Sequence, residues 1–484
     1  MSDQEIFAQR LEKITQLKQL GIDSYPIKFK ADYTAEKILK ELPTEKISAA
    51  GRIIALRKMG KAAFVHLLDS TGKIQIYVKQ DNVGQENYDV FRYFDIGDFM
   101  GVTGTVFATK TGETTIKADS VVMLSKSLRP LPEKWHGLKD IETRYRQRYL
   151  DLISNEESAK TFRNRAKIIS TIRKHLDNNN FMEVETPMMQ SIPGGAAARP
   201  FITHHNALDI DLYLRIAPEL YLKRLIVGGM ERIYELGRTF RNEGMDIKHN
   251  PEFTILEIYQ AYADYKDMMI LCRDIFRAAA SALKLEEISF GENKINLFEE
   301  WNVLSLETAF AEVGISFQSL FGKDSLIETG KKFGIENVSA IPPRKIFDHL
   351  FDKLIKPKLI HPTFITDWPK FLSPLAKSKK DNPEIVERFE LYICSEEFAN
   401  AYSELNDPVD QKSRFEQQVK EREQGDDEAE LYDSDFIRAL EHGMPPTGGL
   451  GIGVDRLIML LTSQESIKDV ILFPLLRPES NPDI

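Results

Sequence analysis

Alternating apolar and polar residues mark the region from about Ile47 to Ser125 as a series of short strands. Five segments carry the alternation: GRIIALRK, AAFVHLLD, KIQIYVKQ, FMGVTGTVFATK and TTIKADSVVML. Glycine, aspartate and threonine turns separate them, and this spacing is typical of small all-β domains. We therefore predict a closed five-stranded β-barrel in the first 140 residues.

The same alternation predicts which side chains face away from the barrel core. Val65 and Leu67 point inward, so Phe64 points outward; Ile76 points inward, so Gln75 points outward. An outward aromatic ring beside an outward amide indicates an oligonucleotide-binding surface. The alternative is an ordinary exposed aromatic side chain.

A helix is predicted ahead of the barrel. Ser2 has the character of an N-cap, and apolar residues recur at helical spacing through Phe7, Leu11, Ile14 and Leu17. We expect this stripe to pack on the domain that follows.

Beyond a proline-containing linker at 128–132 the pattern becomes mixed. A helix ends at the asparagines 178–180, a strand FMEVETP closes at Pro187, and further strands alternate with loops and with a mostly helical stretch from about 266 to 354. Because βαβ regularity is absent from this pattern, we predict an α+β domain over 141–484, with a mostly antiparallel sheet flanked by helices and a helical insertion around 266–354.

Composition narrows the class of protein. The chain has 484 residues, a formal net charge of −10 and 42% hydrophobic residues, as in an ordinary globular protein. Its apolar runs are short and interrupted by charges, so we expect no membrane or export segment. Only two cysteines occur, which favours a reducing cytoplasm over a disulfide framework.

Two arginines in apolar surroundings predict an anion site. Arg241 lies in FRNE and Arg456 ends GLGIGVDR, and a guanidinium matches phosphate or carboxylate oxygens in a bidentate way. The glycines before Arg456 fit neither a Walker loop, because Val454 and Asp455 replace Lys and Ser/Thr, nor a dinucleotide fingerprint. We interpret them as a tight strand-to-helix junction that brings Arg456 close to a ligand.

Carboxylates gather near these arginines along predicted strands. A period of two puts Phe253, Glu257 and Tyr259 on one face, and it places Glu390 opposite the apolar residues of its own strand. Glu397, Asn400 and Glu404 follow Glu390 closely in the chain. Buried carboxylates need cations, so the residues imply Mg²⁺, a cationic ligand or internal ion pairs.

Taken together, these motifs resemble the class II aminoacyl-tRNA synthetases, and most closely the bacterial lysyl-tRNA synthetase family. The helix, strand and Pro187 are similar to the first motif of the class, residues 240–253 to the second, and residues 449–456 to the third. The resemblance covers nearly the whole chain. It implies an oligonucleotide-binding (OB) barrel that reads the anticodon, and a catalytic domain that forms lysyl-adenylate from L-lysine and ATP and then charges tRNA(Lys).

The resemblance also implies roles for single residues in the ATP site. Arg241 would hold the α-phosphate and the lysine carboxylate, Arg456 the γ-phosphate, and Phe253 would stack on adenine. Glu243, His249 and Gly453 would complete the nucleotide site, and Glu390 and Glu397 would hold Mg²⁺. Glu396 is the alternative to Glu397, since Cys394 and Ser395 stand where the family commonly has glycine.

The expected amino acid is lysine. Glu257 and Glu404, with Tyr259 and Asn400, suit a desolvated ammonium better than a carboxylate or an amide. By resemblance, Glu219 would bind the α-amino group and Gly195 would let the backbone approach the amino acid. The alternatives are an aspartyl- or asparaginyl-tRNA synthetase, and a ligase that attaches lysine to a protein acceptor, whose members lack the barrel.

Further expectations concern the tRNA and the assembly. Phe64, Gln75 and Glu113 match the positions that contact an anticodon base in the family, and Pro187 with its helix matches the homodimer interface. One motif points elsewhere: MLSKS at 123–127 resembles a lysine-containing signature of the unrelated class I synthetases. We interpret it as a coincidence, because the sequence has no companion His-Ile-Gly-His element.

Overall fold

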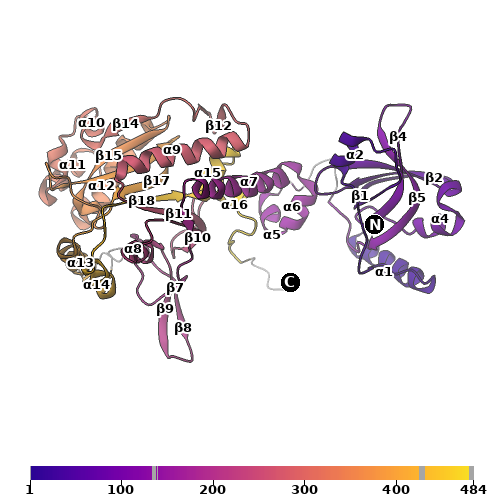
Figure 1. The fold of residues 1–484 in the computed structure, drawn as a ribbon, viewed down its shortest axis with the longest axis horizontal. Coiled ribbons are helices and arrows are strands. Elements are labelled where there is room, and N and C mark those ends of the chain that lie inside the picture. The colour runs from indigo at the N-terminus through magenta and orange to yellow at the C-terminus, as the bar shows by residue number, and fades with distance from the viewer. Residues whose placement is uncertain (1, 133–137, 139, 424–430, 479–484) are drawn as a thin grey trace. The chain divides into compact units, whose positions relative to one another are not determined.

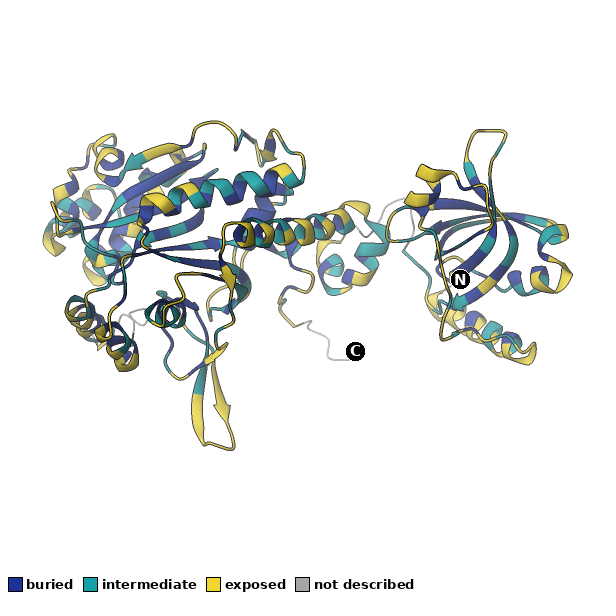
Figure 2. Cartoon of the chain, viewed as in Figure 1, coloured by how far each residue is buried: buried dark blue, intermediate teal, exposed yellow. Residues whose placement is uncertain are grey.

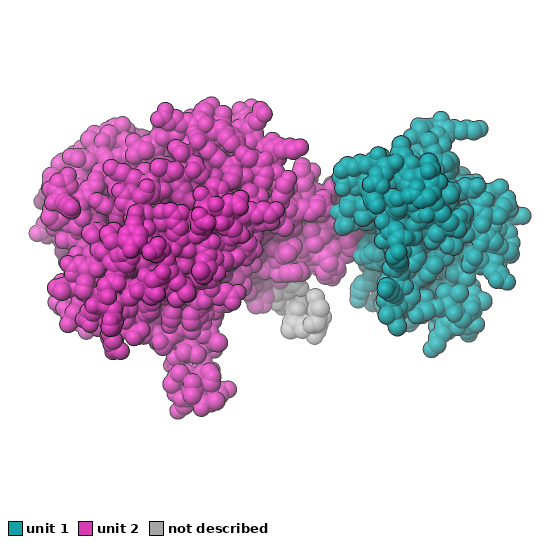
Figure 3. Space-filling view, in the orientation of Figure 1, with its two compact units in different colours: residues 1–139 teal, residues 140–484 magenta. Residues whose placement is uncertain are grey.

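The chain forms two compact units. The computed structural model describes residues 2–132, 138, 140–423 and 431–478. One unit spans residues 1–139 and the other residues 140–484 (Figure 3). No described helix combines the length and the apolar composition that a membrane crossing requires.

The first unit is a closed five-stranded barrel, as predicted. Its strands are β1 (Ile47–Met59), β2 (Ala62–Leu68), β3 (Lys73–Lys79), β4 (Phe99–Ala108) and β5 (Thr114–Ser125), hydrogen-bonded in the order β1-β2-β3-β5-β4 (Figure 1). Val65, Leu67 and Ile76 are buried in its core. The short helix α2 (Ala35–Glu41) precedes β1, and α3 (Gln80–Val83) and α4 (Gln85–Phe91) connect β3 to β4.

The first helix, α1 (Asp3–Gln19), starts at the predicted N-cap but packs differently from the prediction. The Ser2 hydroxyl accepts a hydrogen bond from the backbone of Glu5, whereas Phe7 and Leu11 are exposed. The buried face includes Leu17 and Arg10, whose guanidinium donates to backbone carbonyls of the barrel unit, among them Ile96 O at 3.0 Å. The expectation that the whole apolar stripe packs on its domain was therefore wrong for Phe7 and Leu11. Polar contacts of Arg10 hold this N-terminal half of the helix instead.

Lys126, the lysine of the MLSKS motif, has a structural role. Its ammonium is fully buried in the barrel unit and lies 2.6 Å from Asp95 and 2.7 Å from Asp98. This lysine is a structural ion-pair partner in the part of the chain that forms the barrel, which agrees with the interpretation of the motif as a coincidence.

The second unit is built on an eight-stranded sheet. In the order of hydrogen bonding its strands are β14 (Asn302–Ser305), β15 (Thr363–Pro369), β16 (Ile385–Ile393), β17 (Glu396–Ser403), β18 (Thr447–Gly453), β11 (Glu252–Ala261), β10 (Arg232–Phe240) and β6 (Met182–Glu183). Only the two outermost pairings are parallel. The α+β class with a mostly antiparallel sheet is confirmed.

Helices cover one face of this sheet. α7 (Glu156–Asn178), α9 (Tyr265–Ala282) and α15 (Val454–Leu461) pack on β11, β16, β17 and β18 through a shared apolar core that includes Leu256, Ile258 and Ile452 (Figures 1 and 2). On the other face, α8 (Glu219–Val227), α13 (Pro408–Glu423) and α14 (Ser434–Glu441) pack together around Tyr259 and Phe415. The remaining floor of that face stays open for a ligand.

The other elements complete the unit. α5 (Ile141–Arg146) and α6 (Arg148–Ser154) precede α7, and β7 (Met189–Gln190), β8 (Ile202–His205) and β9 (Ile210–Leu214) form a small sheet. The stretch 266–354 is mostly helical, with α10 (Leu306–Ala311), α11 (Lys323–Lys332) and α12 (Pro343–Leu354), but it also contains the hairpin β12 (Ile288–Phe290) and β13 (Asn293–Ile295). The remaining elements among the described residues are α16 (Ile467–Val470) and four 3₁₀ turns: Phe317–Leu320, Val338–Ala340, Lys356–Lys358 and Lys370–Leu372.

The structure tests two predictions about segments that belong to the motifs. The segment FMEVETP forms only the two-residue strand β6, because it pairs with β10 through Met182 and Glu183 alone. The glycine-rich segment is a strand-to-helix junction, as predicted: β18 lies between β11 and β17, and α15 starts directly after Gly453. Arg456 is therefore in the first turn of α15.

Candidate active site

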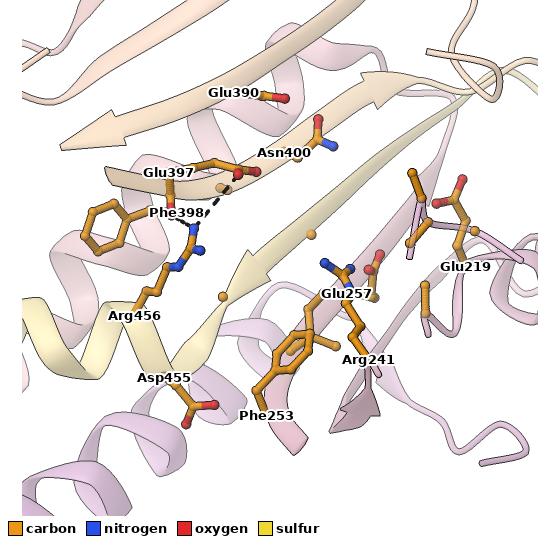
Figure 4. Close-up of a pocket in the computed structure, with 18 of the residues that line it drawn as sticks. Glu219, Arg241, Phe253, Glu257, Glu390, Glu397, Phe398, Asn400, Asp455 and Arg456 are labelled. Carbon is orange, nitrogen blue, oxygen red and sulfur yellow. Dashed lines mark hydrogen bonds and ion pairs between the residues drawn. The ribbon is translucent and has the colours of Figure 1, made fainter. Parts of the chain in front are cut away.

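A cavity of about 380 Å³ lies on the open face of the eight-stranded sheet. β11, β16, β17 and β18 supply much of its floor. The residues predicted for the catalytic site all line it: Gly195, Glu219, Arg241, Glu243, His249, Phe253, Glu257, Tyr259, Glu390, Glu397, Asn400, Glu404, Gly453 and Arg456. Residues up to 261 positions apart in the chain, Gly195 and Arg456, thus line one site, part of which Figure 4 shows.

Arg241 and Phe253 form one part of the cavity. The backbone N–H of Arg241 donates to Pro251 O at 2.9 Å, and the guanidinium carbon lies 5.2 Å from the centre of the Phe253 ring. The Nε atom of Arg241 is buried without a hydrogen-bond partner among the described residues. A cation beside an aromatic face, with an unused donor, is suited to a ligand that carries both an anion and a flat ring.

Arg456 enters the same cavity from α15. Its Nη1 donates to the backbone carbonyl of Glu397 at 2.6 Å, and its Nη2 lies 3.2 Å from Nε2 of His249 (Figure 4 shows the contacts to Glu397). These contacts aim the guanidinium across the cavity from Arg241. Two separated cations in one cavity match a ligand with charges at two positions, such as a polyphosphate chain.

Asp455 holds the junction that presents Arg456. It is buried, and its carboxylate accepts from the backbone of Thr254 at 2.6 Å and from Arg165 at 2.5 Å. These contacts join α15 to β11 and α7. No role was predicted for Asp455, and the contacts show that it positions the arginine next to it.

Glu390 and Glu397 form an acidic patch in the cavity that Arg241 and Arg456 also line. Glu390 is buried and accepts from the Tyr392 hydroxyl at 2.6 Å while Arg388 pairs with its other oxygen. Burial, only partly offset by Arg388, raises the pKa of Glu390 to about 7. Glu397 is half exposed within the cavity, whereas its neighbour Glu396 pairs with Lys248.

Three carboxylates are buried at the other end of the cavity. Glu219, Glu257 and Glu404 are 4%, 7% and 1% exposed, and the Tyr259 hydroxyl donates to Glu257 at 3.2 Å. Burial, followed by the charge of Glu219, raises the pKa of Glu257 to about 8. Burial also raises the pKa of Glu404 well above its ordinary value, against the opposing charge of Lys223.

The protein leaves one oxygen of Glu404 without a partner. Lys223 forms a close ion pair with Oε2, whereas Oε1 has no hydrogen-bond partner among the described residues. A buried carboxylate in this condition is costly unless a donor completes it. The geometry therefore favours a cationic ligand at this end.

Gly195 lies beside Glu219 in a conformation that other residues rarely adopt. Its φ is +85°, and a Cβ at this position would lie 2.8 Å from Cβ of Glu219. Close approach of the backbone to this wall of the cavity thus requires glycine.

Sequence reasoning missed three residues that organise the cavity. Arg388 donates to Asn400 Oδ1 at 3.0 Å, Tyr402 donates to Glu219 at 2.6 Å, and Lys223 lies between Glu219 and Glu404. Strand parity gave a signal for the first two, because Arg388 shares a face with Glu390, and Tyr402 with Asn400. The signal for Lys223 was weaker: it lies one helical turn after Glu219.

The three residues predicted to read the anticodon lie close together on the barrel. Gln75 donates to Glu113 at 2.6 Å, and the Phe64 ring packs 5.0 Å from Tyr77, next to Gln75 in the same sheet. Gln75 points away from the core, as predicted, but it is only 9% exposed. Glu113 and Thr115, whose hydroxyl donates to Gln75 at 2.8 Å, cover it.

The two units match two family models. Residues 140–477 match the model described as tRNA synthetases class II (D, K and N), and residues 47–124 match the OB-fold nucleic acid binding domain. The chain therefore belongs to the class II aminoacyl-tRNA synthetases, with an OB-fold domain ahead of the catalytic domain.

Sequence identity to named relatives shows which family of this class the chain belongs to. The chain is 54% identical to the lysine--tRNA ligase of Pelotomaculum thermopropionicum, over 98% of this chain and 95% of the relative. It is 52% identical to that of Carboxydothermus hydrogenoformans, with 98% of each chain covered, and 51% identical to that of Bacillus cytotoxicus, over 97% of this chain and 96% of the relative. Within the class, the chain is thus a member of the bacterial lysine--tRNA ligase family.

Proposed function

We propose that the cavity binds L-lysine at the end that holds Glu219, Glu257 and Glu404, and ATP between Arg241 and Arg456, and that it forms lysyl-adenylate from them with release of pyrophosphate. As a lysine--tRNA ligase, the protein charges tRNA(Lys) with lysine. The observation that carries the assignment of the lysine end is Glu404, a buried carboxylate in the cavity wall whose Oε1 has no hydrogen-bond donor among the described residues.

The charges of the cavity support lysine as the amino acid. The ammonium at the end of the substrate side chain would donate to Glu404, with Tyr259 and Glu257 close by, and Asn400 would add a polar contact. Glu219 and Gly195 line the wall where the α-amino group would bind. Aspartate or asparagine would leave these carboxylates without a cation.

The arginines would bind the anionic groups of both substrates. Arg241 would contact the lysine carboxylate and the α-phosphate, which brings the attacking oxygen to phosphorus, and Arg456 would hold the γ-phosphate. Phe253 would stack on adenine, with Glu243, His249 and Gly453 around the nucleotide. The contribution of these residues to the rate is orientation and charge stabilisation.

The acidic patch fits Mg²⁺. Glu390 and Glu397 line the same cavity as both arginines, and Mg²⁺ in nucleotide sites is held by one or two carboxylates together with phosphate oxygens. Among the described residues no group of three or more acidic, histidine or cysteine side chains forms a protein-only metal cage. When bound, Mg²⁺ would neutralise phosphate charge, and Glu390 and Glu397 would hold it.

The barrel surface would bind the tRNA anticodon. Phe64 offers a ring for stacking, and Gln75 and Glu113 offer polar atoms beside it. Gln75 already donates to Glu113, so base recognition would exchange that hydrogen bond for one to the RNA. The barrel also argues against a protein acceptor for lysine, since ligases of that kind lack it.

A homodimer and a cytoplasmic location complete the proposal. β6 is an edge strand of the large sheet, and Met182, Met188 and Met189 near Pro187 are each about half exposed. An unpaired edge beside exposed apolar side chains supports an interface between two copies. Both cysteines are free thiols, which agrees with a reducing compartment.

The experiment that tests the lysine site is pyrophosphate exchange into ATP with each of the twenty amino acids. Lysine should support exchange far better than aspartate or asparagine, and preferential exchange with either of those would refute the assignment. The Glu404→Gln variant should raise the KM for lysine much more than the KM for ATP. Equal effects on both constants would contradict the placement of the ammonium beside Glu404.

A further inference from the structure

Lys223 is a buried cation at the lysine end of the cavity that the proposed contacts with substrate do not use. Its side chain is fully buried within α8, and it is absent from the described residues that line the cavity. Its ammonium lies 2.5 Å from Oε1 of Glu219, forms a close ion pair with Glu404, and lies 5.4 Å from the centre of the Tyr402 ring. Lys223 therefore contacts two of the three buried carboxylates from behind the wall.

These contacts leave particular oxygens for the substrate. Lys223 and the Tyr402 hydroxyl both donate to Oε1 of Glu219, and among the described residues Oε2 accepts no hydrogen bond. On Glu404, Lys223 lies beside Oε2, and Oε1 has no partner in the described part of the chain. One oxygen of each carboxylate is thus held by the protein, and the other remains for a ligand.

The charge count gives Lys223 a second effect. When all three are ionised, as an ammonium ligand requires, Glu219, Glu257 and Glu404 supply three negative charges in a space from which water is largely excluded, and Lys223 cancels one of them. The two that remain equal the two ammonium groups of lysine. Without Lys223, Glu404 would lose the cation that lowers the pKa of its carboxyl group, and a buried carboxylate without a cation takes up a proton.

We propose that Lys223 is a positioning residue that sets the specificity of the amino-acid pocket: it orients Glu219 and Glu404 and adjusts the charge of the pocket to that of a diamino acid. The inference rests on the proposed roles of Glu219 and Glu404. Charged and titratable groups face this ammonium from α8, from β11 and from the end of β17: Glu219, Glu257, Tyr259, Tyr402 and Glu404. Burial alone lowers the pKa of a lysine, but the carboxylates of Glu219 and Glu404 raise the pKa of Lys223 above its ordinary value, so it stays charged.

The variant that tests this role is Lys223→Met, which keeps the length of the side chain and removes its charge. We expect the KM for lysine in pyrophosphate exchange to rise about tenfold or more, as for a buried charge left without its partner, while the KM for ATP changes little. Glu404, without its cation, should hold a proton in the empty pocket, and an ammonium that binds Glu404 must expel it. Lysine binding should therefore release up to about one more proton than in the unaltered protein, and the KM should fall more steeply between pH 7 and 9.

Proton release is measured by titration calorimetry in buffers of different ionisation enthalpy, and the folded state of each variant by thermal unfolding. Lys126→Met is the matched control, because Lys126 is also a buried lysine between two carboxylates but lies in the barrel unit. It should lower the thermal midpoint without changing the KM for lysine or the number of protons released. If Lys223→Met does not fold, Lys223→Gln, which keeps a donor without the charge, takes its place.

Two results would overturn the role of Lys223: an unchanged proton count and pH slope, or equal rises in the KM for lysine and ATP. Glu404→Gln separates these results from failure of the lysine site itself. If Glu404→Gln weakens lysine binding but a folded Lys223 variant behaves like the unaltered protein, only the present inference fails. If Glu404→Gln has no effect on lysine, the proposed lysine site fails and the inference fails with it.

Discussion

Gly449 lies directly against the carboxylate of Glu404. A Cβ at position 449 would overlap Oε1 of Glu404 and would come within 2.8 Å of Cε1 of Tyr259. β18 carries Gly449 between Tyr259 on β11 and Tyr402 on β17, so the backbone at this position forms part of the wall. The glycine in this motif therefore makes room for a carboxylate of the amino-acid pocket.

Replacing this glycine should damage lysine binding selectively. We expect Gly449→Ala to displace Glu404 and to raise the KM for lysine by at least about tenfold, or about 1.4 kcal/mol, with a smaller change in the KM for ATP. Gly451→Ala is the graded comparison, because its Cβ would lie 3.3 Å from Oε1 of Glu257 and needs only a small shift. Pyrophosphate exchange measures both, and a larger effect at position 451 than at 449 would contradict the proposed contact.

Lysine binding should depend on pH through Glu257. Burial raises the pKa of Glu257 to about 8, so below that pH the empty pocket holds its carboxyl group protonated. An ammonium requires the ionised form, so binding releases a proton and the affinity rises with pH, by at most about tenfold per unit for one proton, until pH 8. Calorimetric titration of lysine from pH 6 to 8 checks this, and Glu257→Gln should flatten the slope; the same slope in that variant would assign the proton to another group.

Mg²⁺ dependence should separate two adjacent glutamates. Glu397 lines the cavity, whereas Glu396 pairs with Lys248, so Glu397→Gln should raise the Mg²⁺ concentration for half-maximal exchange several-fold, as loss of a ligand charge does. Glu396→Gln is the matched control one position away and should leave the Mg²⁺ titration close to that of the unaltered protein. The opposite result would make Glu396 the ligand.

The barrel should affect tRNA charging and not amino-acid activation. Phe64→Ala should lower kcat/KM for charging by about tenfold or more, since stacking of a base on an aromatic side chain is worth about 1–3 kcal/mol. Gln75→Ala should act in the same direction, with lysine-dependent exchange intact. Phe99→Ala removes another partly exposed ring of the barrel, one that packs on Arg52, and should leave charging unaffected. Loss of exchange in the Phe64 or Gln75 variants would refute the division of labour between the units.

Much of the fold was predictable because its signals are local. The alternation in β2 and β3 identified Val65 and Ile76 as core residues, and the period of two in β11 placed Phe253 and Glu257 on one face before any partner strand was known. The packing predicted for the N-terminal half of α1 was wrong, because this half is held by Arg10, whose carbonyl partners lie far away in the chain. A helical stripe carries no information about such partners.

The sequence by itself determined the strand and helix pattern, the two arginine motifs and the set of carboxylates, because side-chain periodicity and residue type follow directly from the order of the chain. Only the tertiary structure decided how those charges are used. It placed Lys223 behind Glu219 and Glu404, covered Gln75 with Glu113, and set Gly449 against Glu404. Burial and distance fix the strength of such interactions, and both arise only when strands that are remote in the chain become neighbours.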